Sequence, residues 1–218
     1  MKRRLIVFAK EPTKDKVKTR LSTGLSASGC LNLYKAFLKD TINLVKNIRC
    51  TEKILAYDSD GQSPHYLRRI APHFTFYQQK GKDLGIRMHN AFKFAQKKTT
   101  AKTVILGSDS PSLPLNFIKK AFKQLEKCDL VVGPSLDGGY YLIGLKEPSI
   151  KLFKGISWSS ESVLEDTIKR AKVLKKKVAL LDRWYDVDSP EALQHLKADL
   201  KKKECRGSAK WTKRFLKI

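Results

Sequence analysis

Cysteine is scarce in this 218-residue chain, and the few cysteines present do not come in pairs. Cys30, Cys50, Cys128 and Cys205 lie far apart in the sequence, and no CxxC spacing occurs. A disulfide framework and a thiolate zinc site both need closely spaced cysteines. The sequence therefore argues against both kinds of site and fits a reducing cytoplasm.

Long hydrophobic runs are missing as well. The apolar stretch from Leu5 to Ala9 is interrupted by Lys10, which leaves it too short for the apolar core of a signal peptide. No segment approaches the roughly 20 apolar residues that cross a bilayer as a helix. We therefore expect a cytoplasmic protein without a membrane span.

Several catalytic signatures are missing too. The chain has no GxxxxGKS/T phosphate loop and no GxSxG nucleophile elbow. Its histidines, His65, His73, His89 and His195, show no spacing typical of metal ligands. These absences argue against a Walker-type phosphate site, a serine-nucleophile hydrolase and a histidine-based metal centre.

Acidic residues are in the minority, with 21 of them against 45 lysines and arginines and a formal net charge of +24. A lysine-rich solvated surface explains such an excess, and so does attraction of polyphosphate substrates, nucleic acid or an anionic membrane. No RRM, KH, zinc-finger or basic-helix signature is present, which argues against a nucleic-acid partner. A non-catalytic basic nucleic-acid-binding protein on an enzyme fold is the alternative that the charge leaves open.

Short apolar runs alternate with helical patterns along the chain. Strands are predicted at 4–9, 53–57, 74–78, 102–107, 129–133, 140–145 and 178–181, and helices at 28–48, 64–71, 84–98, 115–127, 160–176 and 189–203. Ser28 and Ser189 are the predicted N-caps of the first and the last of these helices.

This alternation predicts an α/β fold, with a mixed, mostly parallel central sheet and helices on both faces. The run 133–145 has no room for a helix between its two strand-like pieces, so it predicts an antiparallel excursion. We expect one Rossmann-like domain at 1–203, followed by a basic C-terminal tail at 204–218.

The loop after the first predicted strand is crowded with cations. Lys10, Lys18 and Arg20 lie in it together with Lys14 and Lys16. Open α/β sheets place phosphate-binding loops at this position, and an anionic ligand would relieve the repulsion among these charges. A solvated loop of a lysine-rich protein is the alternative.

A carboxylate follows the hydrophobic strand predicted at 102–107. Asp109, flanked by the hydroxyl of Ser108, comes where the ligand crevice of such a sheet opens. Mg²⁺ prefers one or two carboxylates together with phosphate oxygens and water. We predict that Asp109 binds a metal; the alternative is an Asp that caps the next helix or closes a turn.

Two DxD patterns also occur. Asp186 and Asp188 precede the helix predicted at 189–203, and because Ser189 explains the cap, Asp188 is a candidate second metal ligand. Asp58 and Asp60 follow a predicted strand and could chelate a metal. Their Ser and Gly neighbours make a plain turn an equally good interpretation.

The segment 137–141, DGGYY, combines a carboxylate with two glycines. Gly138 and Gly139 let the backbone approach a ligand closely, and Asp137 could orient or deprotonate an acceptor hydroxyl. Asp-Gly is also a favoured hairpin pair, so a plain turn is the alternative.

A second candidate anion site lies at the start of the helix predicted at 84–98. Asp83 and Gly85 lie near its N-terminus, and Arg87 together with the helix dipole could bind an anion. A cap with a flexible approach is the competing interpretation. Further on, Trp158 is either a buried anchor or a face for stacking a base or sugar.

These motifs occur together in a known family. The chain resembles the bacterial family known as radical-SAM/selenodomain-associated transferase 1, or arsenosugar-biosynthesis-type glycosyltransferases, in the GT-A-like nucleotide-diphospho-sugar transferase superfamily. The resemblance rests on LIVFAKEP at 5–12, VKTRL at 17–21, DLGIRM at 83–88, ILGSDSPSLP at 105–114, GPSLDGGYYLIGL at 133–145, GISWSS at 155–160 and DVDSPEAL at 186–193.

The resemblance implies a GT-A-type domain that binds a nucleotide or nucleotide-sugar. It implies that Asp109 is the metal-binding carboxylate, that Asp188 is a second carboxylate late in the chain, and that Lys18 and Arg20 form the basic part of the first loop. In one respect this chain departs from the family: Asp15 stands where the first loop usually has a glycine.

We therefore expect a transferase that uses Mg²⁺ or Mn²⁺, a nucleotide-activated donor and a small-molecule acceptor that the sequence does not identify. Asp109 and Asp188 would hold the metal across the diphosphate, and Lys10, Lys18 and Arg20 would neutralise charge on the leaving group; Asp137 would orient the acceptor. Glycosyl transfer is the main expectation, and nucleotidyl transfer with release of pyrophosphate is the alternative.

Overall fold

The structure, a computed structural model, describes residues 1–202 and 208–218. Its centre is a seven-stranded sheet in the order β3-β2-β1-β4-β6-β5-β7. The strands are β1 (Lys2–Lys10), β2 (Glu52–Asp58), β3 (Thr75–Gln78), β4 (Ala101–Leu106), β5 (Leu130–Pro134), β6 (Tyr140–Leu145) and β7 (Val178–Leu180). All neighbouring strands run parallel except β6, which is antiparallel to both β4 and β5. The predicted fold class and the antiparallel excursion at 133–145 are confirmed.

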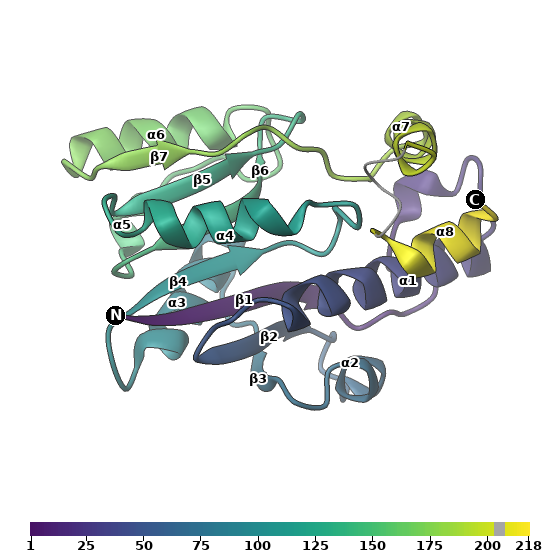
Figure 1. Cartoon of the computed structure of the whole chain (residues 1–218), viewed down its shortest axis with the longest axis horizontal. Coiled ribbons are helices and arrows are strands. Elements are labelled where there is room, and N and C mark those ends of the chain that lie inside the picture. Colours follow the sequence, from purple (N-terminus) through teal and green to yellow (C-terminus); the bar gives the residue numbers. More distant parts are fainter. Residues whose placement is uncertain (203–207) are drawn as a thin grey trace.

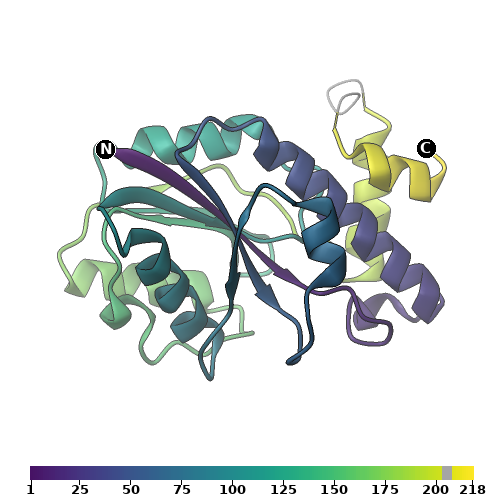
Figure 2. The ribbon, with the colours of Figure 1, turned by 90° about the horizontal axis from the view of Figure 1, so that it is seen from below.

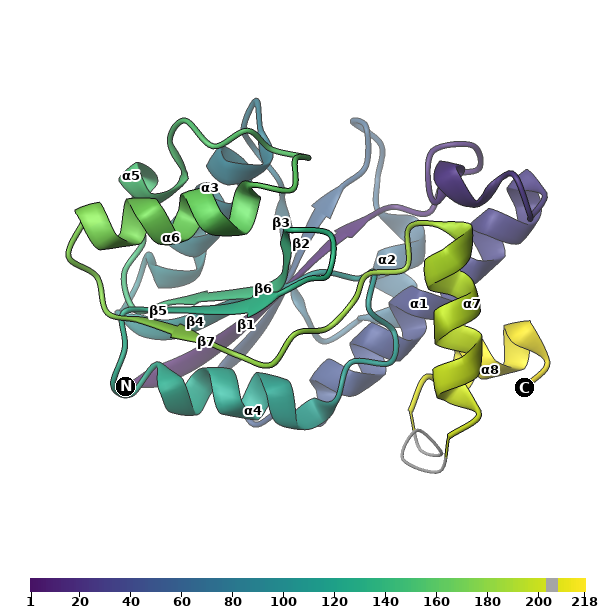
Figure 3. The ribbon, with the colours of Figure 1, turned by 90° about the horizontal axis from the view of Figure 1, so that it is seen from above.

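Helices cover both faces of this sheet (Figures 1 and 3). They are α1 (Ala27–Lys46), α2 (His65–Ile70), α3 (Leu84–Gln96), α4 (Leu115–Gln124), α5 (Ile150–Phe153), α6 (Val163–Val173), α7 (Pro190–Leu200) and α8 (Lys210–Leu216), together with a 3-10 turn, η1 (Thr19–Leu21). The helices α1 and α4 lie on one face, and α3, α5 and α6 lie on the other (Figure 3).

The two faces are built by alternation within the strands. In β1, Leu5 and Val7 point into the core under α1 and α4, whereas Ile6 points into the core under α3. In β4, Val104 and Ile105 divide in the same way. Because both faces are covered, these strands are apolar throughout, and this is why short apolar runs located them.

The ends of two helices illustrate local chemistry. The Ser189 side chain accepts a hydrogen bond from the backbone N–H of Ala192 and caps α7, as predicted. The predicted cap of α1 was wrong: Ser26, not Ser28, accepts the backbone N–H of Gly29 at 3.1 Å. The helix therefore begins one residue earlier than predicted, and Ser28 lies inside its first turn.

The C-terminal segment packs on the domain. In the described part of the predicted tail, α8 lies beside α1 and α7 (Figures 1 and 2). The Asp40 carboxylate on α1 accepts the backbone N–H groups of Trp211 and Thr212 and the Thr212 hydroxyl, at 3.1, 2.8 and 2.6 Å. Residues 204–207 of the predicted tail lie outside the described residues. None of the helices described is both long and apolar enough to cross a bilayer.

The strand order places a crevice beside β1. The chain adds β2 and β3 on one side of β1 and then returns to add β4 on the other side. Open α/β sheets bind ligands outside the carboxyl ends of their strands at such a reversal, and β1 and β4, which pair in parallel, both end at this edge. The fold therefore brings the predicted loops after 4–9 and 102–107 to the two sides of one opening.

Candidate functional site

A cleft of about 750 Å³ opens at these carboxyl ends. The predicted residues that line it are Lys10, Lys18, Arg20, Arg87, Ser108, Asp109, Asp137, Gly139 and Asp188. They come from segments that are far apart in sequence: the loop after β1, the start of α3, the loop after β4, the β5–β6 turn and the segment before α7. The structure thus brings most of the predicted site residues together in one cleft.

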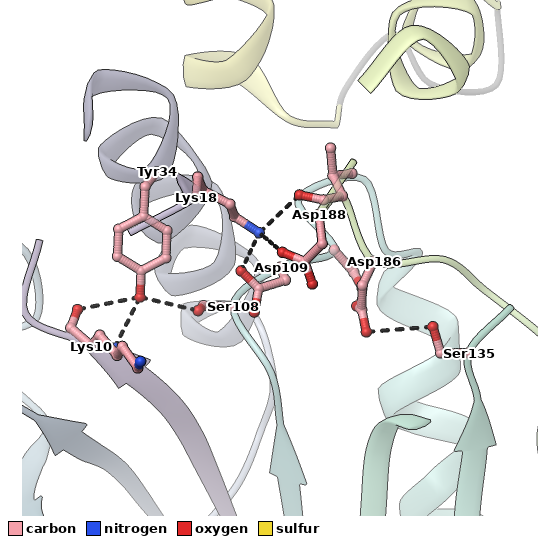
Figure 4. Close-up of polar contacts among 10 residues, drawn as sticks. Lys10, Lys18, Tyr34, Ser108, Asp109, Ser135, Asp186 and Asp188 are labelled. Atoms are coloured by element: carbon pink, nitrogen blue, oxygen red, sulfur yellow. Dashed lines mark hydrogen bonds and ion pairs between the residues drawn. The ribbon is translucent and has the colours of Figure 1, made fainter. Parts of the chain in front are cut away.

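At the base of the cleft, Lys18 joins two carboxylates (Figure 4). Its Nζ lies 2.5 Å from Oδ1 of Asp109 and 2.7 Å from Oδ1 of Asp188, and it donates to the carbonyl oxygen of Val187 at 2.9 Å. The Lys18 side chain is only 3% exposed. Burial alone would lower the pKa of its amine, but the two carboxylates outweigh burial and raise that pKa. The ammonium is therefore charged, and each of its three protons has an acceptor.

This arrangement changes the prediction for Lys18. The sequence predicted a cation free to meet phosphate, whereas the structure uses Lys18 to fasten the loop after β1 to Asp109 and Asp188. The backbone of Lys18 is also unusual, because its φ is 52°, in the left-handed region that L-residues rarely adopt.

A third carboxylate lies behind this pair. Asp186 accepts hydrogen bonds from the hydroxyls of Ser110 at 2.5 Å and Ser135 at 3.4 Å. Burial, and next the neighbouring charge of Asp109, raise the pKa of Asp186 to about 7. Asp186 thus retains a proton near neutral pH much more readily than an exposed carboxyl. It braces the loops that carry Asp109 and Asp188.

Tyr34 is a site residue that the sequence analysis missed. Its hydroxyl accepts the backbone N–H of Lys10 at 2.9 Å and lies 3.4 Å from the Ser108 hydroxyl (Figure 4). Burial, and next the charge of Asp109, raise the pKa of Tyr34, so the phenol stays neutral. Tyr34 fixes the end of β1 next to the loop after β4. In the sequence Tyr34 stands within the apolar pattern of a helix, and nothing there indicates that its hydroxyl reaches the functional site.

Two predicted cations line the cleft without an ion-pair partner among the described residues. They are Lys10 and Arg20, both exposed. Arg87 differs from them: its guanidinium pairs with Asp58 at 2.8 Å and donates to the carbonyl of Gly81 at 3.1 Å. Lys10 and Arg20 are therefore the cations most available to an anionic ligand.

The DxD pattern at 58–60 is divided between two ion pairs. Asp58 pairs with Arg87 across the β2–α3 junction, and Asp60 pairs with Lys16 at 2.7 Å. Asp58 and Asp60 thus have separate basic partners. The sequence had left a turn and a chelating pair as equal alternatives, and this pairing favours the turn.

Three predicted ligand-binding residues have structural roles and do not line the cleft. Asp83 caps α3, because its side chain accepts a backbone N–H of the first turn at 2.8 Å. A β-carbon on Gly85 would lie 2.3 Å from the ring of Trp158, and one on Gly138 would lie 2.1 Å from the carbonyl oxygen of Glu161. Both glycines are therefore needed for packing.

Asp137 combines the two roles that the sequence left open. It lines the cleft, and its Oδ1 accepts the backbone N–H of Gly139 at 3.1 Å within the β5–β6 turn. Gly138 between them has a φ of 83°, which explains the glycine. Asp137 is thus a turn residue that also lines the cleft.

The two carboxylates bound to Lys18 have the donor chemistry of a Mg²⁺ or Mn²⁺ site. Their side chains are 37% and 48% exposed, so their outer oxygens reach the cleft, and their Oδ1 atoms already converge on one cation. The described residues include no cluster of three or more His, Cys, Asp or Glu side chains suited to a metal. Two carboxylates fit a metal that shares its shell with phosphate oxygens and water.

Comparison with known proteins places the fold among nucleotide-handling transferases. A crystal structure from Desulfovibrio desulfuricans G20, named as that of a proposed nucleotide-diphospho-sugar transferase, is 30% identical, with a TM-score of 0.91 over 99% of this chain and 94% of that one. The inositol-1-phosphate CTP transferase of T. maritima is 15% identical, with a TM-score of 0.60 over 96% of both chains, and is similar in fold alone.

Curated relatives agree on the class of enzyme. The 2-phospho-L-lactate guanylyltransferase of Methanobrevibacter ruminantium is 28% identical over 81% of this chain and 77% of its own length. The enzyme of the same name from Methanocaldococcus jannaschii is 26% identical over 92% of this chain and 83% of its own length. The predicted class, transferase, is thereby confirmed, whereas the narrower arsenosugar-type family stays a prediction. A family match over residues 41–160 identifies the chain as a member of the family described as "Uncharacterized protein conserved in bacteria (DUF2064)".

Proposed function

We propose that this protein is a metal-dependent transferase that binds a nucleotide-activated donor in the cleft. The observation that carries the proposal is the convergence of Asp109 and Asp188 on one cation position, at 2.5 and 2.7 Å from Lys18 Nζ. Asp109 and Asp188 would hold Mg²⁺ or Mn²⁺. When bound, the metal would supply Lewis-acid neutralisation of charge on the donor phosphates.

The protein's own cations complete the phosphate site. Lys10 and Arg20 line the cleft on the side of the β1 loop and have no ion-pair partner among the described residues. They would contact the phosphates of the donor and stabilise the negative charge that accumulates on the leaving group, together with the nearby hydroxyl of Ser108. Preorganised charges of this kind commonly supply the largest part of catalysis.

Asp137 would orient the acceptor. Its Oδ1 is held by the Gly139 N–H at 3.1 Å, so its other oxygen has a fixed direction from which to accept an acceptor hydroxyl proton. Asp137 comes from the β5–β6 turn, and in the sheet order β4 separates these two strands from β1.

Two reactions are compatible with this arrangement. In nucleotidyl transfer the acceptor attacks the α-phosphorus and pyrophosphate leaves; the named activity of the curated guanylyltransferases supports this reaction. In glycosyl transfer the acceptor oxygen attacks the anomeric carbon and a nucleoside diphosphate leaves; the likeness to the Desulfovibrio protein supports that one. Both begin with the same binding of donor phosphates and metal.

The test is a thermal-shift panel of GTP, CTP, UDP-glucose and GDP-mannose, each with Mn²⁺ and again with EDTA. A ligand at one hundred times its dissociation constant stabilises the native state by about 2.7 kcal/mol, so a true donor raises the melting temperature clearly. We expect a shift that needs Mn²⁺ and that the Asp109→Asn variant loses. Asp182→Asn is the matched control, because Asp182 is 61% exposed and pairs with Lys120 outside the cleft. The same shift in EDTA, or in Asp109→Asn, would contradict the proposal.

A further inference from the structure

The edge of the sheet opposite the cleft is strongly basic. Strands β1, β2, β4, β5 and β7 begin at this edge and β6, which runs the other way, ends there. Six segments meet at it and are here called the amino edge: 1–4, 46–53, 97–102, 126–129, 146–151 and 172–177. In Figure 1 it lies on the left, beside the N-terminus. From its charge and contacts we infer that the amino edge docks on the surface of an anionic lipid bilayer, independently of the reaction in the cleft.

Four of these segments are joined at the start of β1. The backbone N–H of Thr51 donates to the carbonyl of Arg3 at 2.7 Å. The Arg4 guanidinium donates to the carbonyl of Thr99 at 2.7 Å. The Arg3 guanidinium lies 3.4 Å from the Glu126 carboxylate. Segments 1–4, 46–53, 97–102 and 126–129 therefore form one surface.

The other two segments continue that surface toward β7. The backbone N–H of Asp129 donates to the carbonyl of Lys177 at 2.9 Å, and the N–H of Lys146 donates to the carbonyl of Asp129 at 3.1 Å. Neighbouring strands lie about 4.8 Å apart, so a sheet of seven strands presents an edge about 30 Å long. An edge of this length suits an extended partner better than a single small anion.

The basic charge of the protein is concentrated at the amino edge. Its six segments contain sixteen of the 45 lysines and arginines but only four of the 21 acidic residues. The loops at the other edge, which hold the cleft, contain eight basic and eleven acidic residues. Those loops are 10–20, 58–64, 79–83, 107–114, 135–139, 156–161 and 181–189. A uniformly lysine-rich surface does not explain this difference.

Most cations of the amino edge are free to meet a partner. Ten of them are exposed and have no carboxylate partner within the described part of the chain. They are Lys2, Lys46, Arg49, Lys97, Lys98, Lys127, Lys151, Lys172, Lys175 and Lys177. Like charges on one edge repel one another, and an anionic surface would relieve that repulsion. Each basic residue close to an anionic bilayer strengthens binding by about fivefold.

Nucleic acid fits the amino edge less well. The six segments contain no aromatic residue on which a base could stack. They contain three arginines, the side chains best suited to bidentate contacts with bases and phosphates. Two of the three are already paired, Arg3 with Glu126 and Arg4 with Glu52. The remaining cations are nearly all lysines, which attract phosphate as point charges.

Exposed apolar side chains among the lysines favour a bilayer. Met1 is 69% exposed beside Lys2, and Val173 is 80% exposed beside Lys172. Peripheral proteins combine attraction of basic residues to anionic lipids with entry of apolar side chains into the headgroup region. Docking by the amino edge leaves the cleft, at the opposite ends of the strands, facing away from the bilayer and open to soluble substrates.

Sedimentation with lipid vesicles tests the inference on the whole protein. One set of vesicles is pure phosphatidylcholine, and the other contains about 30% phosphatidylglycerol, whose headgroup is anionic. At low salt we expect the partition coefficient on the anionic vesicles to be higher by about tenfold or more. About 0.5 M salt should remove most of this difference, because it screens the charges.

A triple variant at the amino edge locates the contact. Reversing Lys98, Lys172 and Lys175 to Glu should lower the partition coefficient on anionic vesicles by about tenfold or more. Replacing the same lysines by Gln should give a smaller loss in the same direction. The matched control reverses three exposed lysines of the other edge, Lys14→Glu, Lys80→Glu and Lys82→Glu, and changes the net charge equally. We expect the control to bind nearly as the native protein does, and thermal melting confirms that each variant is folded.

Three results would overturn the inference. Equal partition of the native protein on neutral and anionic vesicles would show that the amino edge does not recognise anionic lipid. Equal losses in the amino-edge variant and its control would show that overall charge, and not this edge, attracts the bilayer. Binding of duplex DNA or single-stranded RNA at the same salt, without binding to either set of vesicles, would assign the edge to nucleic acid instead.

Discussion

Lys18 lies 2.5 Å from Asp109 and is buried, while the carboxylate is more than a third exposed. In this ion pair the lysine is therefore shielded from solvent, whereas the carboxylate is open to the cleft. Because Asp188 is bound to the same nitrogen, one lysine of the loop after β1 holds together the loop after β4 and the segment before α7. The carboxylates that we propose as metal ligands are thus positioned before any metal binds.

Replacing Lys18 by methionine tests this positioning. Met has a similar length but no charge, so Asp109 and Asp188 would be left without their common cation. We expect a loss of about 1–3 kcal/mol in unfolding free energy, less than for a fully buried pair because the exposed carboxylates can rehydrate. Mn²⁺ should restore part of this stability, since a divalent cation supplies the missing charge. Chemical denaturation with and without Mn²⁺ measures both effects.

Lys169→Met is the control for that variant. Lys169 pairs with Glu165 on the surface of α6, and both side chains are at least 64% exposed. Exposed pairs of this kind contribute little, so the change should stay within about 0.5 kcal/mol. If Lys18→Met were as stable as Lys169→Met, the ion pair would not be what holds the two loops together.

Gly85 should tolerate no side chain, because Trp158 fills the space beside it. The β-carbon of an alanine there would lie 2.3 Å from the indole ring, and the ring is backed by Phe153. We expect Gly85→Ala to destabilise the protein by about 1–3 kcal/mol despite the better helix propensity of alanine. Displacement of the indole should also change the tryptophan fluorescence of the native state.

Gly24→Ala provides the matched comparison. A β-carbon on Gly24 would meet nothing within 4 Å, so alanine should be neutral or stabilise by up to about 1 kcal/mol through the unfolded state. Equal effects at Gly85 and Gly24 would mean that Trp158, which lines the cleft, is not fixed against α3.

The strands of the sheet were predicted well because the pattern that indicates a buried strand lies within a few consecutive residues. A strand buried on both faces is a short apolar run, and β1 and β4 have no other pattern to confuse with it. The short helix α5 was missed because four residues are too few to show a helical period, and α8 was missed because it lies in a basic C-terminal segment that looks like a tail. Its anchor, Asp40, lies far away on α1, and no local pattern reveals that contact.

In the candidate site, too, local features were predicted from the sequence and contacts between distant segments were not. Asp109 and Asp188 were predicted, since carboxylates after strands and before a capped helix meet at one edge of a parallel sheet. The partners of cations were not predicted, because an ion pair depends on distances between loops. Lys18 and Arg87 accordingly turned out to have carboxylate partners, whereas Lys10 and Arg20 do not.

Asp40→Ala should detach the C-terminal helix. The carboxylate accepts two backbone N–H groups and one hydroxyl at the start of α8, and alanine would leave these three donors unpaired. We expect a loss of about 1–3 kcal/mol and faster proteolysis in the C-terminal segment. Thr212→Val, which removes only the hydroxyl donor, should show a smaller loss. Unchanged proteolysis of Asp40→Ala would mean that α8 is held by its apolar contacts alone.

The predicted resemblance to the arsenosugar-type family implies that Asp15 stands where a glycine is usual in the first loop. Its φ is 64°, which lies in the left-handed region that glycine adopts freely. Aspartate is one of the few other residues that tolerate it, because its short polar side chain can bond locally. The side chain is exposed and is not among the described residues that line the cleft. A glycine at this position would therefore fit the same shape of the loop that carries Lys18.

Asp15→Gly and Asp15→Ala together test that conclusion. Glycine should leave the unfolding free energy within about 1 kcal/mol of the native value, whereas alanine, which has a β-carbon but no polar group, should lie about 1 kcal/mol below glycine. Glycine also removes a negative charge close to Lys14 and Lys16, so a metal-dependent nucleotide should bind somewhat more tightly at low salt, with the gain fading as salt screens it. Alanine as stable as glycine would show that the loop does not need a left-handed residue at 15, and the departure from the family would then be one of backbone shape as well as charge.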